Sequence, residues 1–474
     1  MRPRLRAQRG AARRGAPGPV QLHRVRLEEL GAGDQRFRVV RRTATASRPA
    51  PPRDASPPAG PFDVAVVGAG PAGSTVAALL AGAGRSVALL DAARFPRHKI
   101  CGEFVPPAAA RSFEALGVLE EIERLGPRRH VGMAVIAPGG EKVLGRYGAS
   151  DQRGFSLRRL DLDRVLLANA RRAGAHVLEG WRLVDLERRS GEGFDLLLAA
   201  AAPGGAQAIA PVAPAFAARS RLRARLLVGA DGRNSLVARR LGLRRRGHRH
   251  RRWAVMGHFR GVVAPEDHGE MIVTPYGYCG INPLPGGLAN VCLVLDPARP
   301  AATPPGRRRL LAFFRERIAS HPLTRRRLAA ADLAEGLWST GPIACRASAS
   351  VSDGALLVGD AAGFYDPFTG EGIGMALRGG EMAAEVLDEA LRRGDLSRGA
   401  LLPYEARRRA AFAGRLLLDR ILQALLARPR VTDWVARRLR HEPALADLLA
   451  RVTGGTADAG EVLRPRFVAR LLLA

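Results

Sequence analysis

Glycines and an acid between residues 68 and 91 have a spacing that suits a phosphate-bearing ligand. Gly68, Gly70 and Gly73 stand in the order Gly-x-Gly-x-x-Gly, and Asp91 follows the last glycine by eighteen residues. The first glycine permits a tight turn, the second lets a pyrophosphate approach the backbone, and the third lets a helix pack closely on a strand. A carboxylate at Asp91 can accept hydrogen bonds from the ribose hydroxyls of an adenosine, and its charge argues against a 2′-phosphate there.

The residues around these glycines predict the strand–helix–strand unit that such a turn requires. An apolar strand at 63–67 precedes the turn, and an Ala- and Leu-rich helix continues from it to about residue 83. A second apolar strand at 86–90 ends at Asp91. Because strand, helix, strand and acid occur in register within about thirty residues, we expect an α/β fold with a Rossmann-like dinucleotide-binding domain.

Two later apolar strands also end in a carboxylate beside a glycine. One leads into Asp231 and the other into Asp360. A glycine-rich turn follows the second strand and opens a helix. The glycines of this turn are Gly370, Gly372 and Gly374.

A short loop after Asp91 combines a lysine with a cysteine in the order Lys99-Ile-Cys101-Gly102-Glu103. The chain has only two lysines, so 75 − 2 = 73 of its basic residues are arginines. A lysine at position 99 therefore indicates a specific need. The thiol of Cys101 could tune a redox cofactor or donate a proton, and a small residue that only packs there is the equal alternative.

Taken in order, these motifs resemble those of FAD-dependent oxidoreductases of the p-hydroxybenzoate hydroxylase fold. More narrowly, they resemble the geranylgeranyl reductase family, whose relatives include the flavin-dependent halogenases. The resemblance extends from about Phe62 to the end of the chain. It implies an FAD/NAD(P)-binding Rossmann-like domain, an antiparallel β-sheet substrate domain and a helical C-terminal region.

The resemblance also implies positions for individual residues. Asp360 would hydrogen-bond the ribityl chain of FAD, and the turn at 370–374 would offer backbone N–H groups to the flavin ring. Asp231 would lie near the pyrophosphate. Arg159, in an Arg-x-x-Leu-Asp pattern, would lie near the cofactor, and the loop at 99–103 would reach the flavin face.

Simpler interpretations of two of these residues stay open. Arg159 could instead form a surface ion pair, and Asp163, four residues later, could be a helix N-cap.

The region expected to face the substrate departs from the relatives. Reductases of isoprenoid lipids tend to have Tyr-x-Trp-x-Phe-Pro here and halogenases Trp-x-Trp-x-Ile-Pro, whereas this chain has Tyr276-Gly-Tyr278-Cys-Gly-Ile-Asn-Pro283. The halogenase tryptophans are missing, which disfavours halogenation. Gly280 and Asn282 replace bulky side chains, so we expect a wider or more polar pocket than an isoprenoid tunnel.

Composition limits the partners. The net charge is +31, but the near-exclusive use of arginine is typical of a GC-rich coding bias, and no nucleic-acid-binding motif is present. The four cysteines are far apart, with no histidines at metal-binding spacing, so we expect no metal site. No apolar run is long enough to span a bilayer. We predict a cytoplasmic protein with no specific nucleic-acid partner. A peripheral membrane contact and the oligomeric state are left open.

The pattern changes along the chain predict alternating segments of two domains. The first segment carries an excess of arginine and proline, which indicates a disordered arm or a mis-assigned start. The predicted segments are a basic arm at 1–60, cofactor segments at 61–130, 155–250 and 346–396, substrate-sheet segments at 131–154 and 251–345, and a helical region at 397–474.

The predicted function is an FAD-dependent oxidoreductase that reduces a double bond of a hydrophobic small molecule. The expected substrate is isoprenoid, quinone or polyketide-like, with NAD(P)H as the transient reductant. One alternative is an FAD-dependent monooxygenase that hydroxylates an aromatic or polyketide-like compound. An alternative of another class is a basic protein that binds nucleic acid or a membrane surface and only reuses the dinucleotide fold.

Overall fold

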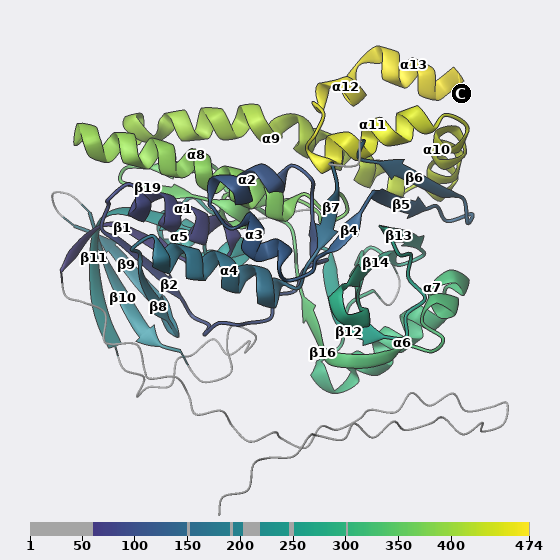
Figure 1. Cartoon of the computed structure of the whole chain (residues 1–474), viewed down its shortest axis with the longest axis horizontal. Helices are drawn as coiled ribbons and strands as arrows, with labels where there is room; N and C mark the ends of the chain where they lie inside the picture. The colour runs from purple at the N-terminus through teal and green to yellow at the C-terminus, as the bar shows by residue number, and fades with distance from the viewer. Residues whose placement is uncertain are drawn as a thin grey trace, which may run out of the picture. The chain divides into compact units, whose positions relative to one another are not determined.

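The computed structural model describes residues 60–148, 152–189, 193–201, 219–245, 251–299 and 302–473. The predicted basic arm therefore lies, except for Gly60, outside the described residues. Within them, two large β-sheets dominate the fold, and helices cover both (Figure 1).

The first sheet has a parallel centre, with the strand order β18-β19-β11-β1-β2-β8. The middle of its central strands is rich in Val, Leu and Ala that are buried on both faces, as a parallel sheet between layers requires. The strand β10 pairs antiparallel with the first half of β11, and β9 pairs antiparallel with β10, so these two strands branch from the main strand order. The bounds are β1 (Pro61–Val67), β2 (Val87–Asp91), β8 (His176–Glu179), β9 (Trp181–Arg188), β10 (Phe194–Ala200), β11 (Arg219–Gly229), β18 (Val351–Ser352) and β19 (Ala355–Leu357).

Three helices form one apolar layer over this sheet (Figure 1). They are α1 (Pro71–Gly82), α4 (Arg159–Arg172) and α8 (Gly372–Arg393). Helix α1 begins with Pro71 directly after the glycine turn, where a proline costs no hydrogen bond. Because α1 lies against both α4 and α8, the amino end of each helix is held near the carboxyl edge of the sheet.

The second sheet has the order β16-β12-β15-β14-β13-β5-β6 and is antiparallel except between β13 and β5. We call it the substrate sheet. One face packs on α6 (Leu310–Ala319) and α7 (Pro322–Arg327). Its strands are β5 (Gly132–Ile136), β6 (Lys142–Arg146), β12 (Trp253–Arg260), β13 (His268–Thr274), β14 (Gly277–Leu284), β15 (Leu288–Leu295) and β16 (Asp332–Thr340).

Short elements and a helical C-terminal part complete the fold. Helix α9 (Arg398–Leu426) lies along α8, and Tyr404 donates a hydrogen bond to Leu357 O at 2.9 Å. The other helices are α2 (Ala109–Ala115), α3 (Leu119–Glu123), α5 (Leu236–Arg240), α10 (Pro429–His441), α11 (Pro443–Gly454), α12 (Gly460–Leu463) and α13 (Pro465–Leu473). The small strands are β3 (Phe104–Val105), β4 (Arg128–His130), β7 (Gly154–Ser156), β17 (Cys345–Arg346) and β20 (Gly363–Phe364).

This architecture confirms the predicted fold class: a Rossmann-like α/β part, an antiparallel sheet and a helical C-terminal region. Among the described residues, no helix combines the length and the apolar character needed to cross a bilayer.

Candidate active site

The turn between β1 and α1 leaves space at only one of its three motif glycines. A Cβ on Gly68 would lie 2.4 Å from Ala230 O, and a Cβ on Gly73 would lie 1.8 Å from Gly68 O. By contrast, a Cβ on Gly70 would meet only the Arg97 guanidinium, at 3.9 Å. Gly68 and Gly73 are therefore needed for close backbone packing, and the open side of Gly70 is where a pyrophosphate could approach.

Asp91 lies beside this turn. Its Oδ2 accepts the backbone N–H of Ala69 at 3.0 Å, and its Oδ1 accepts that of Ala93 at 2.8 Å. Arg97 Nη2 is 3.6 Å from Oδ2. The acid at the end of β2 thus lies against the glycine turn, as ribose binding by this carboxylate would require.

Arg159 forms a buried bidentate ion pair with Asp163. The two oxygens of Asp163 accept Arg159 Nε and Nη2, each at 2.7 Å, and Arg97 Nη1 lies 2.9 Å from Oδ2. Burial alone would raise the pKa of Asp163, but Arg159 and Arg97 hold it below its ordinary value. The N-cap interpretation of Asp163 is wrong, because α4 begins at Arg159 and Asp163 lies within the helix. The ion pair exists, but it is buried rather than on the surface.

The Asp231 turn supplies a helix cap and approaches Lys99. Asp231 Oδ2 accepts the N–H groups of Leu236 at 2.6 Å and Val237 at 3.2 Å, at the start of α5. Its Oδ1 is buried and has no hydrogen-bond partner among the described residues, so it could receive a donor from a ligand. A Cβ on Gly232 would lie 4.0 Å from Lys99 Nζ.

Lys99 and Asp360 are electrostatic neighbours in the same region. Protein atoms crowd the Lys99 ammonium although part of the side chain is exposed, and this desolvation, together with Arg97 and Arg159, lowers its pKa. Burial raises the pKa of Asp360, and the nearby Lys99 opposes that shift. Residues from distant segments, Asp91, Lys99, Arg159, Asp231 and Asp360, thus border one region at the carboxyl edge of the parallel sheet.

The glycine turn before α8 packs tightly on β3 and the residues that follow it. Gly370 has φ +72°, and a Cβ there would lie 2.6 Å from the Phe104 ring. A Cβ on Gly374 would lie 2.8 Å from Pro106 Cγ, whereas one on Gly372 would have an ordinary contact at 3.6 Å. The turn therefore brings the amino end of α8, with its unpaired N–H groups, close to the loop that carries Cys101.

Two asparagines of the substrate sheet hold that loop, which we call the Lys99–Glu103 loop. Asn282 Nδ2 donates to Gly102 O at 2.9 Å, and Asn290 Nδ2 donates to Cys101 O at 2.9 Å and to Glu103 Oε2 at 3.0 Å. Asn282 was expected to make the pocket wider or more polar. In the structure its amide nitrogen anchors the loop.

Glu103 is a site residue that the sequence did not reveal. It is 2% exposed and has φ +58°, a left-handed conformation that is unusual for glutamate. Its Oε1 accepts the N–H of Arg159 at 2.8 Å, and its Oε2 lies 2.7 Å from His258 Nε2. The one available signal was its place next to Cys101 and Gly102 in the motif.

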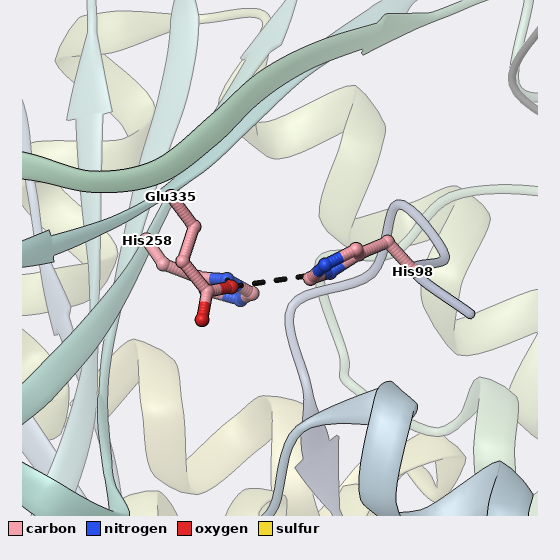
Figure 2. Close-up of side chains that lie close together, drawn as sticks. All are labelled: His98, His258 and Glu335. Carbon is pink, nitrogen blue, oxygen red and sulfur yellow. Dashed lines mark hydrogen bonds and ion pairs between the residues drawn. The ribbon is translucent and has the colours of Figure 1, made fainter. Parts of the chain in front are cut away.

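His258 lies between two carboxylates, one of which is drawn in Figure 2. Its Nδ1 lies 2.6 Å from Glu335 Oε2, and its Nε2 faces Glu103. Burial lowers the pKa of His258, but the two carboxylates outweigh burial and raise it to about 9. Hydrogen bonding to His258 lowers the pKa of Glu335 to about 2. His98 Nδ1 lies 3.9 Å from Glu335 Oε2.

The donor atoms of His98, His258 and Glu335 all lie within 4.8 Å of one another. Such a set could bind a metal ion, but ligands of one zinc ion stand about 3 Å or more apart, given bonds of about 2.0–2.2 Å. The 2.6 Å contact between His258 and Glu335 is instead that of a charged hydrogen bond. The arrangement is therefore a chain of ion pairs.

Comparison with known proteins places this geometry in a family. Residues 61–417 match the family model described as FAD binding domain. The chain belongs to this family. It is an FAD-dependent oxidoreductase, and the open side of Gly70, the free oxygen of Asp231 and the amino end of α8 fit such a cofactor.

Individual relatives differ in their reactions. A menaquinone reductase of Mycobacterium tuberculosis is 30% identical over 417 residues, which cover 82% of this chain and 90% of the relative. A digeranylgeranylglycerophospholipid reductase of Methanoculleus marisnigri is 27% identical over 367 residues, 75% of this chain and 84% of the relative. The structure of the flavin-dependent brominase Bmp2 shares the fold, with a TM-score of 0.69 and 21% identity over 87% of this chain and 98% of that one.

Proposed function

We propose that this flavoenzyme reduces a double bond of a hydrophobic substrate of the isoprenoid, quinone or polyketide-like class, with NAD(P)H as the transient reductant. The observation that carries the proposal is an apolar row on the substrate sheet. This row lies between the two places where the sheet contacts the cofactor part.

The row follows from strand register. Met256 stands opposite both Trp338 and Cys292, and Gly280 stands opposite both Cys292 and Met271. Side chains at paired positions of neighbouring strands share one face of a sheet. Four adjacent apolar or sulfur-bearing side chains with a glycine among them make an apolar, adaptable lining, which would suit an apolar ring or chain.

Polar contacts flank the row on both sides. On one side lie Asn282, two positions from Gly280 on β14, and Asn290, two positions from Cys292 on β15. Both asparagines hold the Lys99–Glu103 loop. On the other side, Tyr278 lies two positions from Gly280 on β14. It donates a hydrogen bond at 2.6 Å to Oδ1 of Asp366, a residue that precedes the glycine turn of α8. Cys292 lies close enough to Cys101 and Asp366 for both to influence its pKa. The apolar row therefore lies between the two cofactor segments, and it belongs to an apolar cluster that includes Ile100 and Phe368 from those segments.

Bound FAD supplies hydride transfer between a nicotinamide and the substrate. The protein supplies orientation and, in this proposal, a proton. Burial raises the pKa of the Cys101 thiol, and Arg159 beside it opposes that shift. The Sγ of Cys101 therefore keeps its proton at neutral pH, and in this proposal it donates that proton to the substrate.

The names of two relatives support a lipid-like substrate, because one is a menaquinone reductase and another reduces a digeranylgeranyl lipid. The test is an anaerobic reaction of the holoenzyme with NADPH or NADH and a prenylated naphthoquinone or a geranylgeranyl lipid. We expect a product heavier by two hydrogens for each double bond reduced. Absence of any such product with either substrate would contradict the proposal.

A matched control for Cys101 is Cys279. This cysteine is buried on the face of β14 that is turned away from the apolar row. Cys101→Ala is expected to slow product formation at least tenfold while flavin reduction by NAD(P)H keeps its rate. Cys279→Ala is expected to change neither rate. Equal effects of the two variants would assign Cys101 a packing role only.

A second candidate is oxygenation, which the shared fold with the brominase favours. Admission of air to the reduced holoenzyme with substrate would then give a product that has gained one oxygen atom, together with stoichiometric oxygen consumption. The alternative of another class, a basic protein that only reuses the dinucleotide fold, is not carried further, because the chain is an FAD-dependent oxidoreductase.

A further inference from the structure

We infer that His258 is a positioning residue that clamps the Lys99–Glu103 loop onto the substrate sheet. The inference goes beyond the proposed function, because it concerns how the cofactor site is held together and applies to whichever reaction bound FAD performs.

The clamp joins three segments that are distant in sequence. His258 comes from the middle of β12, Glu335 from the edge strand β16, and Glu103 from the loop before β3. The imidazole is fully buried, and each ring nitrogen has a carboxylate oxygen within 2.7 Å. Figure 2 shows the His258 ring next to Glu335, with His98 facing the pair from its loop.

Glu103 links His258 to the residues around the cofactor site. Its other oxygen accepts the first N–H of α4, at Arg159, and the Arg159 side chain lies beside the Cys101 thiol. The left-handed backbone of Glu103 costs free energy, which its anchored carboxylate can offset. Loss of the clamp should therefore displace both the loop that carries Lys99 and the amino end of α4.

The groups that face His258 leave it positively charged at neutral pH. Glu103 and Glu335 contact the ring directly. From the same loop His98 faces Glu335, and from the amino end of α4 Arg158 Nη1 pairs with Glu335 Oε1 at 3.1 Å. On the neighbouring strand β15, Asn290 is neutral and shares the Glu103 oxygen. Among the described residues, the one permanent cation that forms an ion pair with either of these two carboxylates is Arg158.

The test is a pH titration of the FAD-loaded full chain from pH 6 to 10, followed by the visible absorption and fluorescence of the flavin. In the wild-type protein we expect a spectral transition near pH 9. Glu335→Gln should move that transition lower by about one unit or more, because one stabilising charge is lost. His258→Gln should abolish it.

The matched control is His268→Gln. His268 also lies in the substrate sheet, on β13, and its Nδ1 lies 2.7 Å from Asp267, but its hydrogen bonds with described residues stay within that sheet and its margin. The His268→Gln variant should therefore show the same spectral transition as the wild-type protein. A wild-type protein without a transition, or a His258→Gln protein that retains it, would overturn the inference. If His258→Gln does not fold, Glu335→Gln decides alone, because an unmoved transition contradicts the clamp.

Discussion

The glycine turn at 68–73 and the Lys99–Glu103 loop border the same cofactor site but are held in place differently. The turn is shaped by backbone sterics, since a single Cβ at Gly73 would collide with Gly68 O at 1.8 Å. The loop is shaped by polar side chains from another sheet, chiefly Asn282, Asn290 and His258.

This difference separates two kinds of functional constraint. The turn is held by its own backbone and by neighbours within the first sheet, Ala230 and Asp91, and none of these contacts comes from the substrate sheet. The loop depends on contacts across 155 to 189 positions, so it links the position of Cys101 to the position of the substrate surface. We expect the turn to determine whether the cofactor binds. We expect the loop to determine how the bound cofactor is positioned relative to the substrate sheet.

The largest expected effect contrasts two glycines of the turn. Gly73→Ala should destabilise the fold by about 3 kcal/mol or more, because the Gly68 carbonyl would have to move out of the turn. Gly70→Ala should leave the unfolding free energy of the FAD-free protein within about 1 kcal/mol of wild type and should weaken FAD binding. Urea denaturation and flavin titration measure the two effects. Equal destabilisation by both variants would remove the distinction between packing and binding glycines.

The next effect concerns the buried ion pair that adjoins both regions. Asp163→Asn leaves the buried Arg159 without its carboxylate and Arg97 with Asp91 alone, and it should cost about 3–5 kcal/mol in urea denaturation. The control is Glu120→Gln, which removes an exposed pair with Arg124 and should cost less than about 0.5 kcal/mol. A loss below about 1 kcal/mol for Asp163→Asn would show that solvent reaches the pair.

The loop, unlike the turn, should respond to pH. The pKa of His258 is raised to about 9, so its contribution to stability is complete below about pH 6.5 and is lost as pH rises through 9. The pKa of Glu335 is lowered to about 2, so its contribution is complete above about pH 4.5 and is lost as pH falls through 2. Between pH 6.5 and 9 the wild type should lose up to about 3 kcal/mol relative to His258→Gln. Parallel stability curves over that range would contradict this.

The smallest effect concerns the asparagine anchors. Asn290→Ala and Asn282→Ala should each cost about 1–3 kcal/mol, because buried loop carbonyls lose their donors. Asn290→Ala should have the larger effect on flavin fluorescence, since Asn290 bonds both Cys101 and Glu103. An unchanged flavin environment in both variants would mean that the loop does not need the sheet.

The same contrast explains what the sequence could predict. The glycine turn, the acid at the end of β2 and the fold class follow from local spacing, because each needs only neighbours in sequence. Arg159 and Asp163 are four positions apart, a spacing that lets two side chains meet on one face of a helix. The spacing does not indicate whether that face is buried or exposed. The cofactor roles of Lys99, Asp231 and Asp360, like the domain boundaries and the proton role of Cys101, stay predictions.

The contacts of Glu103 and His258 could not be predicted. They join the loop before β3 to the middle of β12, and no periodicity or motif links the two positions. The pairing depends on the register of a whole sheet against the cofactor part. A single histidine in an alternating strand looks the same whether it is buried between carboxylates or exposed.

The most direct test of the account is the anaerobic visible spectrum of the purified full chain during addition of NADPH or NADH, followed by a prenylated quinone. We expect one flavin per chain, slow bleaching by the nicotinamide, and return of the oxidised spectrum when the quinone is added. A colourless protein that takes up no added FAD would contradict the assignment of the glycine turn and of every residue placed around it.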